Sequence, residues 1–532
     1  MDDRVGSWAV RPVGRSAVLV DAADRSSAAL AAGFGLAASR RGVACSDIVA
    51  GANTVLLIGA DPSALTGMVE VLSELAAETI DDPTRDDEGP EMEIPVRYDG
   101  ADLDQVARMV ELTTGEVVAL HSGATYRAAF MGFAPGFAYL VGLSETLMVR
   151  RRLQPRSAVP AGSVAIADTY SAVYPRSTPG GWHLLGTTDV VVFDADRRPP
   201  ALLATGACVR FVEVRNHPSS PRRRLPGPVD REAWRDRGSV GGVTVEVVDP
   251  GPLTTLQDQG RAGHAGAGVP PSGAADGASA ALANRLVGND TEAAVLETTM
   301  GGLTLRLATA PGTWRTVAVT GAVAPVTVDG VGRSVNAPFD LHTGQMVRVG
   351  PAVAGLRSYI AVSGGLEVPA VLGSRSTDLL SGIGPPVLKA GDVVALGADE
   401  GRRPGVDVAP VATRGGPPVL VHVRLGPRAD WLTDGGLRLL ESATWTVAPT
   451  SNRVGVRLRG PALERSRRGE LAPEGLVTGA IELTPADELV VCGPDHPVTG
   501  GYPVVGVVDE AELGAVAQLR PGDMVRLRAD RS

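Results

Sequence analysis

At 532 residues the chain is longer than one hydrophobic core usually supports, so two to four domains are expected. Apolar residues make up 44% and aromatic residues only 4%, while 66 glycines and 40 prolines predict tight turns between short aliphatic strands rather than a fibrous chain. A net charge of −10 argues against nucleic acid as a partner, and the lack of an 18-residue apolar run or a signal-peptide pattern argues against a membrane and predicts a cytoplasmic protein.

Residues 1–90 predict a small α/β domain. The run 53–58 (NTVLLI) is typical of a buried strand, and helices are expected on either side of it. Residues 81–91 (DDPTRDDEGPE) are acidic and interrupted by proline, which indicates a solvated connector rather than a site.

The pattern becomes β-rich over residues 91–215. One helix is expected from Asp102 to Thr114, ended by Gly115. Short Val- and Ile-rich runs then alternate with glycine turns, which predicts a β-barrel. Residues 216–240 are rich in Pro, Arg and Ser and predict a linker.

Two further β-barrel domains are expected at residues 241–415 and 416–532, with a helix from 277 to 287. The repeats support this organisation. The segment 179–186 (PGGWHLLG) resembles 499–506 (TGGYPVVG), and each follows a similar strand, GSVAI and GAIEL. The same small β module is therefore predicted on both sides of the linker.

Polar or aromatic residues in glycine-rich loops are the candidate site residues. The loop 131–140 (MGFAPGFAYL) carries three aromatic side chains, which indicates either a pocket mouth or a hydrophobic corner that plugs a barrel end. His121 precedes this loop, although a single histidine is more often structural. In the second half, Asp258 and Arg261 are close enough in sequence to form a structural salt bridge. Ser272 and Asp276 are placed to cap the next helix. Alternatively, the free backbone amides at the start of that helix could bind an anionic ligand.

The basic residues are 49 arginines and one lysine, Lys389. This excludes a Walker A loop, a biotinylated lysine in its usual Met-flanked turn, and the Ser–Ser–Lys set of amidases. The seven histidines and three cysteines show no metal-ligand spacing, and no nucleophile elbow is present. From the residues alone, the chain is a β-barrel protein whose polar loops bind a small ligand.

Together these segments resemble two subunits of one enzyme family, 5-oxoprolinase. The first half resembles its B subunit, a family also described as allophanate hydrolase subunit 1, and the second half resembles its C subunit. The motifs that carry the resemblance are LHSGATYR (120–127), GFAPGFAYL (132–140), Pro155-Arg156, VPAGSVAIA (159–167) and YPRSTPGGWHLLG (174–186) in the first half, and PGPLTTLQDQGR (250–261), GVPPSGAAD (268–276), LGSRST (372–377) and TGGYPVVG (499–506) in the second. The resemblance implies cyclophilin-like β-barrels, a mainly β fold, and relatives in urea carboxylase and in the Kip pair.

The resemblance also implies an ATP-dependent hydrolase component that opens 5-oxoproline to glutamate. It implies magnesium-bound ATP as co-substrate and no covalent biotin on this chain. It also implies a separate A subunit of the LamB/YcsF class as partner, and it is compatible with a homo-oligomer. In the family an aspartate usually occupies the position of Asn452, which weakens a metal- or base-like role there. Two alternatives remain: a biotin-dependent carboxyltransferase module, and a non-catalytic kinase regulator of the Kip type.

The loops around these residues are expected to converge on one site without a bound metal. The expected catalytic residues are Asp258, Arg261, Arg453, Asp495 and His121. The expected substrate- or cofactor-binding residues are Phe133, Pro135, Gly136, Phe137, Gly180, Gly181, Trp182, Gln257, Ser272, Asp276, Arg375, Thr499, Gly500, Gly501 and Tyr502. In this hypothesis Arg261, Arg375 and Arg453 replace the missing lysine in holding phosphate.

Overall fold

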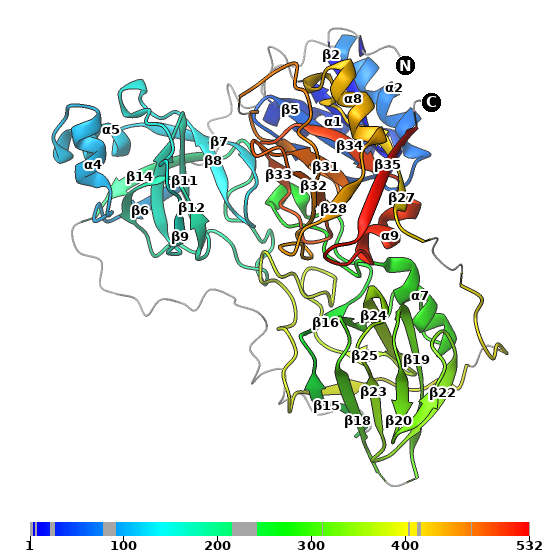
Figure 1. Cartoon of the computed structure of the whole chain (residues 1–532). Coiled ribbons are helices and arrows are strands. Elements are labelled where there is room, and N and C mark those ends of the chain that lie inside the picture. The colour runs from blue at the N-terminus through cyan, green and yellow to red at the C-terminus, as the bar shows by residue number, and fades with distance from the viewer. Residues whose placement is uncertain are drawn as a thin grey trace.

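The computed structural model describes residues 4–5, 8–21, 27–77, 92–214, 242–310, 312–402, 405–411, 416–469 and 471–530. Within these ranges the protein is mainly β, as predicted, and its strands form four groups (Figure 1). The expected connector at 81–91 and linker at 216–240 lie outside the described residues. No helix in the described ranges is long and apolar enough to cross a membrane.

The N-terminal unit is a small antiparallel sheet with two helices on one face, α1 (Ser27–Arg41) and α2 (Ala64–Ala77). Its strands run in the order β1 (Arg4–Val5), β2 (Trp8–Val13), β3 (Ala17–Asp21), β5 (Thr54–Gly59) and β4 (Cys45–Ala50). Successive side chains of a strand point to opposite faces, so Val55 and Leu57 pack under the helices while Leu56 packs on the other face. Both faces of β5 are covered, which explains its unbroken apolar run.

The second unit is a seven-stranded barrel. Around the ring its strands are β6 (Met92–Val96), β13 (His183–Thr187), β10 (Ser163–Ala167), β11 (Tyr170–Val173), β8 (Ala138–Val141), β7 (Thr125–Met131) and β14 (Cys208–Glu213). Strand β14 pairs in parallel with β6, and a bridge between Arg97 and Thr187 joins β6 to β13. A small sheet of β9 (Arg156–Val159) and β12 (Thr178–Gly180) lies beside the ring.

The single helix expected from Asp102 to Thr114 is wrong. The structure has two helices, α4 (Leu103–Met109) and α5 (Thr114–Ser122). The second begins because Thr113 and Glu116 form a capping box, in which each side chain binds the other residue's backbone N–H. Gly115 therefore lies inside α5 rather than ending a helix.

The C-terminal unit is a closed barrel with the same order of strands as the second unit. Around the ring these are β27 (Val419–Leu425), β34 (Val504–Val508), β31 (Ala480–Leu483), β32 (Leu489–Cys492), β29 (Gly455–Arg459), β28 (Trp445–Val447) and β35 (Met524–Asp530). The register shifts between Val164 and Ala165 in one barrel and between Ile481 and Glu482 in the other, which are matching places of the repeat. The repeated motifs therefore form equivalent strands. The helices α8 (Asp434–Ser442) and α9 (Leu513–Ala517) complete this unit.

Hydrogen bonding divides the strands of the middle unit into two sheets that face each other across one core, a more open form of the barrel expected for residues 241–415. One sheet contains β21 (Val331–Arg333), β20 (Val326–Val328), β23 (Met346–Val349), β18 (Leu303–Ala308), β15 (Thr244–Pro250), β26 (Val393–Leu396) and β25 (Leu366–Glu367). The other contains β16 (Leu253–Gln257), β17 (Val295–Thr299), β24 (Ala354–Val362), β19 (Trp314–Val323) and β22 (Pro338–His342). The helix α7 (Gly277–Leu286) has the bounds that the sequence predicted to within one residue.

The N-terminal sheet packs on the C-terminal barrel. In Figure 1 the blue N-terminal strands lie beside the orange and red strands of the last unit. Leu19 and Leu56 of this sheet share one core cluster with Leu476 and Val507 of the barrel. Residues from the two ends of the chain thus form one interface, and the candidate site lies beside it.

Candidate functional site

Arg453 is the centre of a buried polar cluster. It lies in the turn between β28 and β29, and only 1% of its surface is exposed. Its Nε and Nη2 donate to the carboxylate of Asp495 at 2.9 and 3.0 Å, and its Nη1 donates to Glu297 at 2.6 Å. Burial alone would raise the pKa of Glu297, but the charges of Arg453 and Arg357 hold that pKa below its usual range. One guanidinium therefore binds carboxylates from two units, and Arg357 supplies a second positive charge to Glu297.

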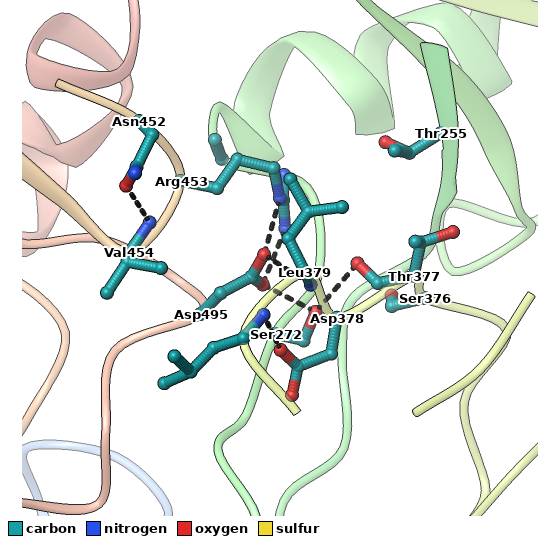
Figure 2. Close-up of polar contacts among 12 residues, drawn as sticks. Thr255, Ser272, Ser376, Thr377, Asp378, Leu379, Asn452, Arg453, Val454 and Asp495 are labelled. Carbon is teal, nitrogen blue, oxygen red and sulfur yellow. Dashed lines mark hydrogen bonds and ion pairs between the residues drawn. The ribbon is translucent and has the colours of Figure 1, made fainter. Parts of the chain in front are cut away.

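Asp495 joins three segments that are far apart in the sequence. Besides its contacts with Arg453, it accepts a hydrogen bond of 2.8 Å from the Ser272 hydroxyl and one of 3.1 Å from the backbone N–H of Leu379 (Figure 2). The predicted residues Ser272, Arg453 and Asp495 are therefore in direct contact. Asn452 lies next to this cluster, and its Oδ1 accepts a hydrogen bond of 2.8 Å from the N–H of Val454 (Figure 2). An aspartate oxygen would accept the same hydrogen bond, so asparagine in place of the family's aspartate leaves the conformation of this turn unchanged.

Asp258 organises a neighbouring loop. It accepts hydrogen bonds from the hydroxyls of Ser374 and Ser376 at 2.6 and 2.5 Å, and from the backbone N–H of Arg375 at 2.5 Å. Arg261 does not donate to Asp258 but to the carbonyl of Ser376 at 2.5 Å. Its Nε and Nη1 have no hydrogen-bond partner, although the residue is only 3% exposed. Asp258 is thus saturated, whereas Arg261 retains unused donors.

Asp378 belongs to the same cluster and was not predicted from the sequence. It is 1% exposed and accepts hydrogen bonds from the backbone N–H groups of Leu380 and Ser381 at 2.9 Å. Burial and the neighbouring carboxylate of Asp495 raise the pKa of Asp378 to about 6. Asp378 therefore lies close enough to Asp495 for the two carboxyl groups to interact electrostatically.

A cavity of about 260 Å³ lies between the N-terminal sheet and the C-terminal barrel. Its walls include Val13, Ser16 and Asp47 from the first half, and Arg261, His496 and Val507 from the second. His496 is 2% exposed, and its Nδ1 lies 2.8 Å from the carbonyl of Pro497. Burial lowers the pKa of His496, so the ring is neutral near pH 7. A carbonyl only accepts, so Nδ1 carries the proton and Nε2, which has no partner, is left as a base.

The aromatic loop of the first half contacts the second half. The backbone N–H of Gly136 donates to the carbonyl of Ala267 at 2.9 Å, and Gly132 approaches Thr499 so closely that a Cβ would lie 1.8 Å from its hydroxyl oxygen. The rings of Phe133 and Phe137 pack edge to face, and Phe137 also contacts Trp182. The loop therefore forms part of the contact between the first barrel and the second half of the chain.

Several predicted residues have clear structural partners. Asp276 caps helix α7 through the N–H of Ser279, as the structural alternative proposed. The amide of Gln257 donates to the carbonyl of Thr377 at 3.0 Å, and the Nε of Arg375 donates to the carbonyl of Val368 at 2.9 Å. The side chain of Arg375 is thus engaged outside the cluster. The remaining predicted residues lie in three loops: Pro135 in the aromatic loop, and, in the two equivalent loops of the repeat, Gly180 and Gly181 before β13 and Gly500, Gly501 and Tyr502 before β34.

The structure does not bring His121 to this cluster. The residue lies at the end of α5, on the side of the first barrel that faces away from the other units (Figure 1). Its ring nitrogens lie 2.8 Å from the Tyr98 hydroxyl and 2.9 Å from the Ser171 hydroxyl, and its ring stacks on Phe211. Burial lowers its pKa to about 3. His121 is therefore a neutral core residue, because local partners satisfy both ring nitrogens.

Four functional candidates were missed: Asp47, Glu297, Asp378 and His496. Glu297 gave a usable signal, because a carboxylate in the middle of an apolar strand (VLETT) must have a buried partner. Asp378 follows the noted motif GSRS by two residues. Within the described residues, no three His, Cys, Asp or Glu side chains gather as a set that would hold a metal ion.

Two family models match the chain. Residues 8–203 match the carboxyltransferase domain, subdomains C and D, and residues 267–529 match the carboxyltransferase domain, subdomains A and B. The chain is 33% identical to the C subunit of the 5-oxoprolinase of Escherichia coli K12, and the match covers 53% of this chain and 89% of that protein. It is 41% identical to the B subunit of the 5-oxoprolinase of Escherichia coli O157:H7, and this match covers 31% of this chain and 77% of that protein.

Larger relatives match only in part. The chain is 36% identical over 311 residues to the urea amidolyase of Lachancea kluyveri, but these residues are 53% of this chain and only 16% of that protein. Among solved structures, the crystal structure of TTHA0988 is similar with a TM-score of 0.83 and 32% identity, and it covers 96% of this chain and 99% of that one. The order of all units is therefore shared with that protein.

Proposed function

Because the chain belongs to the carboxyltransferase-domain family, with subdomains C and D before A and B, we propose that it is the joined B and C component of an ATP-dependent 5-oxoprolinase. The observation that carries the proposal is the cavity, whose walls come from both halves. Neither half alone would form this cavity. In an enzyme with separate B and C subunits, the two subunits would have to associate to form it. The proposed partner is a separate A subunit, and the proposed location is the cytoplasm.

The proposed reaction opens a lactam, whose carbonyl carbon is a poor electrophile. Transfer of the γ-phosphoryl group of ATP to the amide oxygen makes this carbon attackable. Water then adds to it, the ring C–N bond breaks, and the amine leaves with a proton, which gives an acyl phosphate. A second water releases phosphate, so the products are glutamate, ADP and phosphate. Magnesium would enter with the nucleotide phosphates, as it does where few protein ligands are present.

The contacts support different roles for the three predicted arginines. Arg453 donates to two carboxylates, and Arg375 donates to a backbone carbonyl, so both organise the loops. Arg261 keeps unused donors at the cavity, where it would bind the carboxylate of 5-oxoproline. His496 would take a proton from the attacking water through its free Nε2.

The test is reconstitution of the purified chain with a candidate A subunit, 5-oxoproline and ATP. Glutamate and phosphate should appear together, and omission of the A subunit should abolish both. Arg261→Met should lower kcat/KM by about 100-fold, since loss of a charged hydrogen bond to the substrate costs about 1.5–3 kcal/mol. The matched control is Arg306→Met, which removes an arginine half-exposed on β18. Glutamate release by the chain alone, or an equal loss in the control, would contradict the proposal.

The likeness to urea amidolyase supports a second candidate, a carboxyltransferase that receives a carboxyl group from biotin on another chain. The single lysine of this chain is no objection to it, because the biotin would be carried elsewhere. This function predicts ATP-independent transfer of carboxylate from a carboxylated biotin carrier to an amide such as urea. Transfer in that assay, with no glutamate in the first, would favour this candidate.

A further inference from the structure

The first barrel contacts the loops around the cavity but does not form its walls. The described wall residues belong to the N-terminal sheet, to the loop after β16 and to the C-terminal unit, and none of them lies within residues 92–214. One of the contacts between this barrel and the second half is made by the side chain of Arg176. Any influence of the first barrel on the cavity therefore passes through the loops that it touches.

Arg176 extends from an ordered part of the first barrel to a turn of the middle unit. Two residues earlier, the backbone N–H and carbonyl of Tyr174 both hydrogen-bond to residues 162–163. The Nη1 of Arg176 donates to the carbonyl of Leu380 at 2.9 Å. A Cβ on Gly382 would lie 3.1 Å from Nη1, 3.2 Å from Nη2 and 3.4 Å from Cζ, so the whole guanidinium packs against this glycine.

The turn that receives this arginine spans residues 378–383 and is closed by its own hydrogen bonds. The backbone N–H groups of Asp378 and Gly382 each donate, at 2.9 Å, to a carbonyl at the other end of the turn. Ile383 belongs to a core cluster against which Phe193 of the first barrel packs. The first barrel therefore holds this turn by an apolar contact as well as by a guanidinium.

The same segment is joined to Arg261, the residue proposed to bind the substrate carboxylate. Arg261 donates to the carbonyl of Ser376, just before the turn, at 2.5 Å. A Cβ on Gly384, just after the turn, would collide with the same carbonyl and would lie 3.2 Å from Nη2 of Arg261. Arg176 and Arg261 therefore contact one short segment, residues 376–384, from two different parts of the chain.

Charge supports this arrangement. Burial lowers the pKa of the Arg176 guanidinium, and the negative charge of Asp378 opposes that shift. Burial also lowers the pKa of Arg261, and Asp378 opposes that shift as well. Because the pKa of Asp378 is about 6, its carboxyl group is mainly ionised near pH 7 and attracts both arginines.

We propose that Arg176 is a positioning residue of the enzyme: it fixes the segment 376–384, and through the carbonyl of Ser376 it fixes Arg261 at the cavity. The inference rests on the proposed function, because that function assigns Arg261 to the substrate carboxylate. In this arrangement the first barrel acts on substrate binding without touching the substrate.

Hydrogen exchange of the purified full chain, measured by mass spectrometry on peptides that cover residues 376–384, tests the contact without any reaction. Arg176→Met removes the donor and the charge, so exchange in this segment should become about fivefold faster or more, as expected for the loss of a hydrogen bond from a charged group. Arg176→Lys keeps the charge and a donor, and it should restore part of the protection. Peptides from the rest of the first barrel should exchange as in the native chain.

The matched control is Arg127→Met. Arg127 lies on β7 of the same barrel and also donates to one backbone carbonyl, that of Gly206, at 3.1 Å. This acceptor belongs to the first barrel, so the control should leave exchange over residues 376–384 unchanged.

Kinetics of the reconstituted enzyme test the consequence for the cavity. Arg176→Met should raise the KM for 5-oxoproline by about fivefold or more and lower kcat less, because the misplaced Arg261 binds the substrate carboxylate less well. Arg176→Lys should recover part of the KM, and Arg127→Met should behave as the native enzyme.

The proposal is overturned if Arg176→Met leaves exchange over residues 376–384 unchanged, if exchange rises throughout the first barrel, or if Arg127→Met has an equal effect on this segment. A fall in kcat with an unchanged KM would overturn it as well. If the native reconstituted enzyme forms no glutamate, the proposed function fails, and the exchange experiment still decides whether Arg176 holds the segment.

Discussion

The carboxylate of Asp47, on strand β4 of the first half, accepts a hydrogen bond of 2.8 Å from the backbone N–H of Ala265 in the second half. Its other oxygen accepts from the N–H of Gly263 at 2.9 Å. Asp47 therefore fixes the loop that begins at Arg261, and both residues line the cavity. Asp47 is a positioning residue in this arrangement, because it holds the loop of a proposed substrate-binding residue.

Asp47→Ala should raise the KM of the reconstituted enzyme for 5-oxoproline more than it lowers kcat. Two backbone N–H groups lose their acceptor. The loss costs about 1–3 kcal/mol at the part-buried N–H of Ala265, so the loop and Arg261 should shift. Steady-state kinetics would measure the split between the two parameters. Asp47→Asn keeps one acceptor and should restore part of the KM. Asp61→Ala, an exposed change in the same domain, is the control. A fall in kcat alone would contradict the positioning role.

Arg453→Ala should destabilise the protein by about 3–5 kcal/mol, because it leaves Asp495 buried without its paired cation and leaves Glu297 with Arg357 alone. The melting temperature and the denaturant midpoint would measure this loss. Arg459→Ala, which removes an arginine that is 62% exposed, should change stability by about 0.5 kcal/mol or less. Equal stability of the two variants would mean that the buried cluster does not hold the two units together.

The sequence alone suggests a different result for Arg453, namely a surface-loop change that leaves the melting temperature nearly unaltered. The premise of that expectation is wrong, because Arg453 is 1% exposed, which a glycine-rich loop does not reveal. The equivalence of the two barrels was predictable, since the Gly-Gly-aromatic repeats mark matching strands, but their strand order was not predicted. The packing of Leu19 against Val507 was not, because no local pattern shows which distant surface covers a strand. The composition of the polar loops pointed to Asp258, Ser272 and Asp495 as candidate site residues. Only the fold shows that the carboxylate of Asp258 already accepts its full set of hydrogen bonds.

Stability should depend on pH through Asp378. Its pKa is raised from the usual 3.8 to about 6, so the folded state binds its proton more tightly than the unfolded state does. The resulting contribution is fully present below about pH 4 and is lost as pH rises through 6, by up to about 3 kcal/mol. Denaturant unfolding of the native chain and of Asp378→Asn between pH 4.5 and 7.5 would measure it. The free energy of unfolding of the native chain, relative to that of Asp378→Asn, should fall over this range. Glu482, with a pKa raised by burial to about 7, also titrates there, but it should change the stability of both proteins equally. A constant difference would show that Asp378 does not titrate there.

Cleavage between the two halves should leave them associated. The composition of residues 216–238 predicts the first site of limited proteolysis, which would separate the first barrel from the middle unit in the chain. The N-terminal sheet nevertheless packs on the C-terminal barrel through Leu19, Leu56 and Val507, and Asp47 binds the second half as well. We therefore expect two bands on a denaturing gel but one peak, at the mass of the intact chain, in size-exclusion chromatography. Leu56→Asp, which places a charge in that shared core, should split the cleaved sample into two peaks, whereas the exposed change Glu70→Ala should not. Two separate peaks from the cleaved native chain would show that this interface is too weak to join the halves.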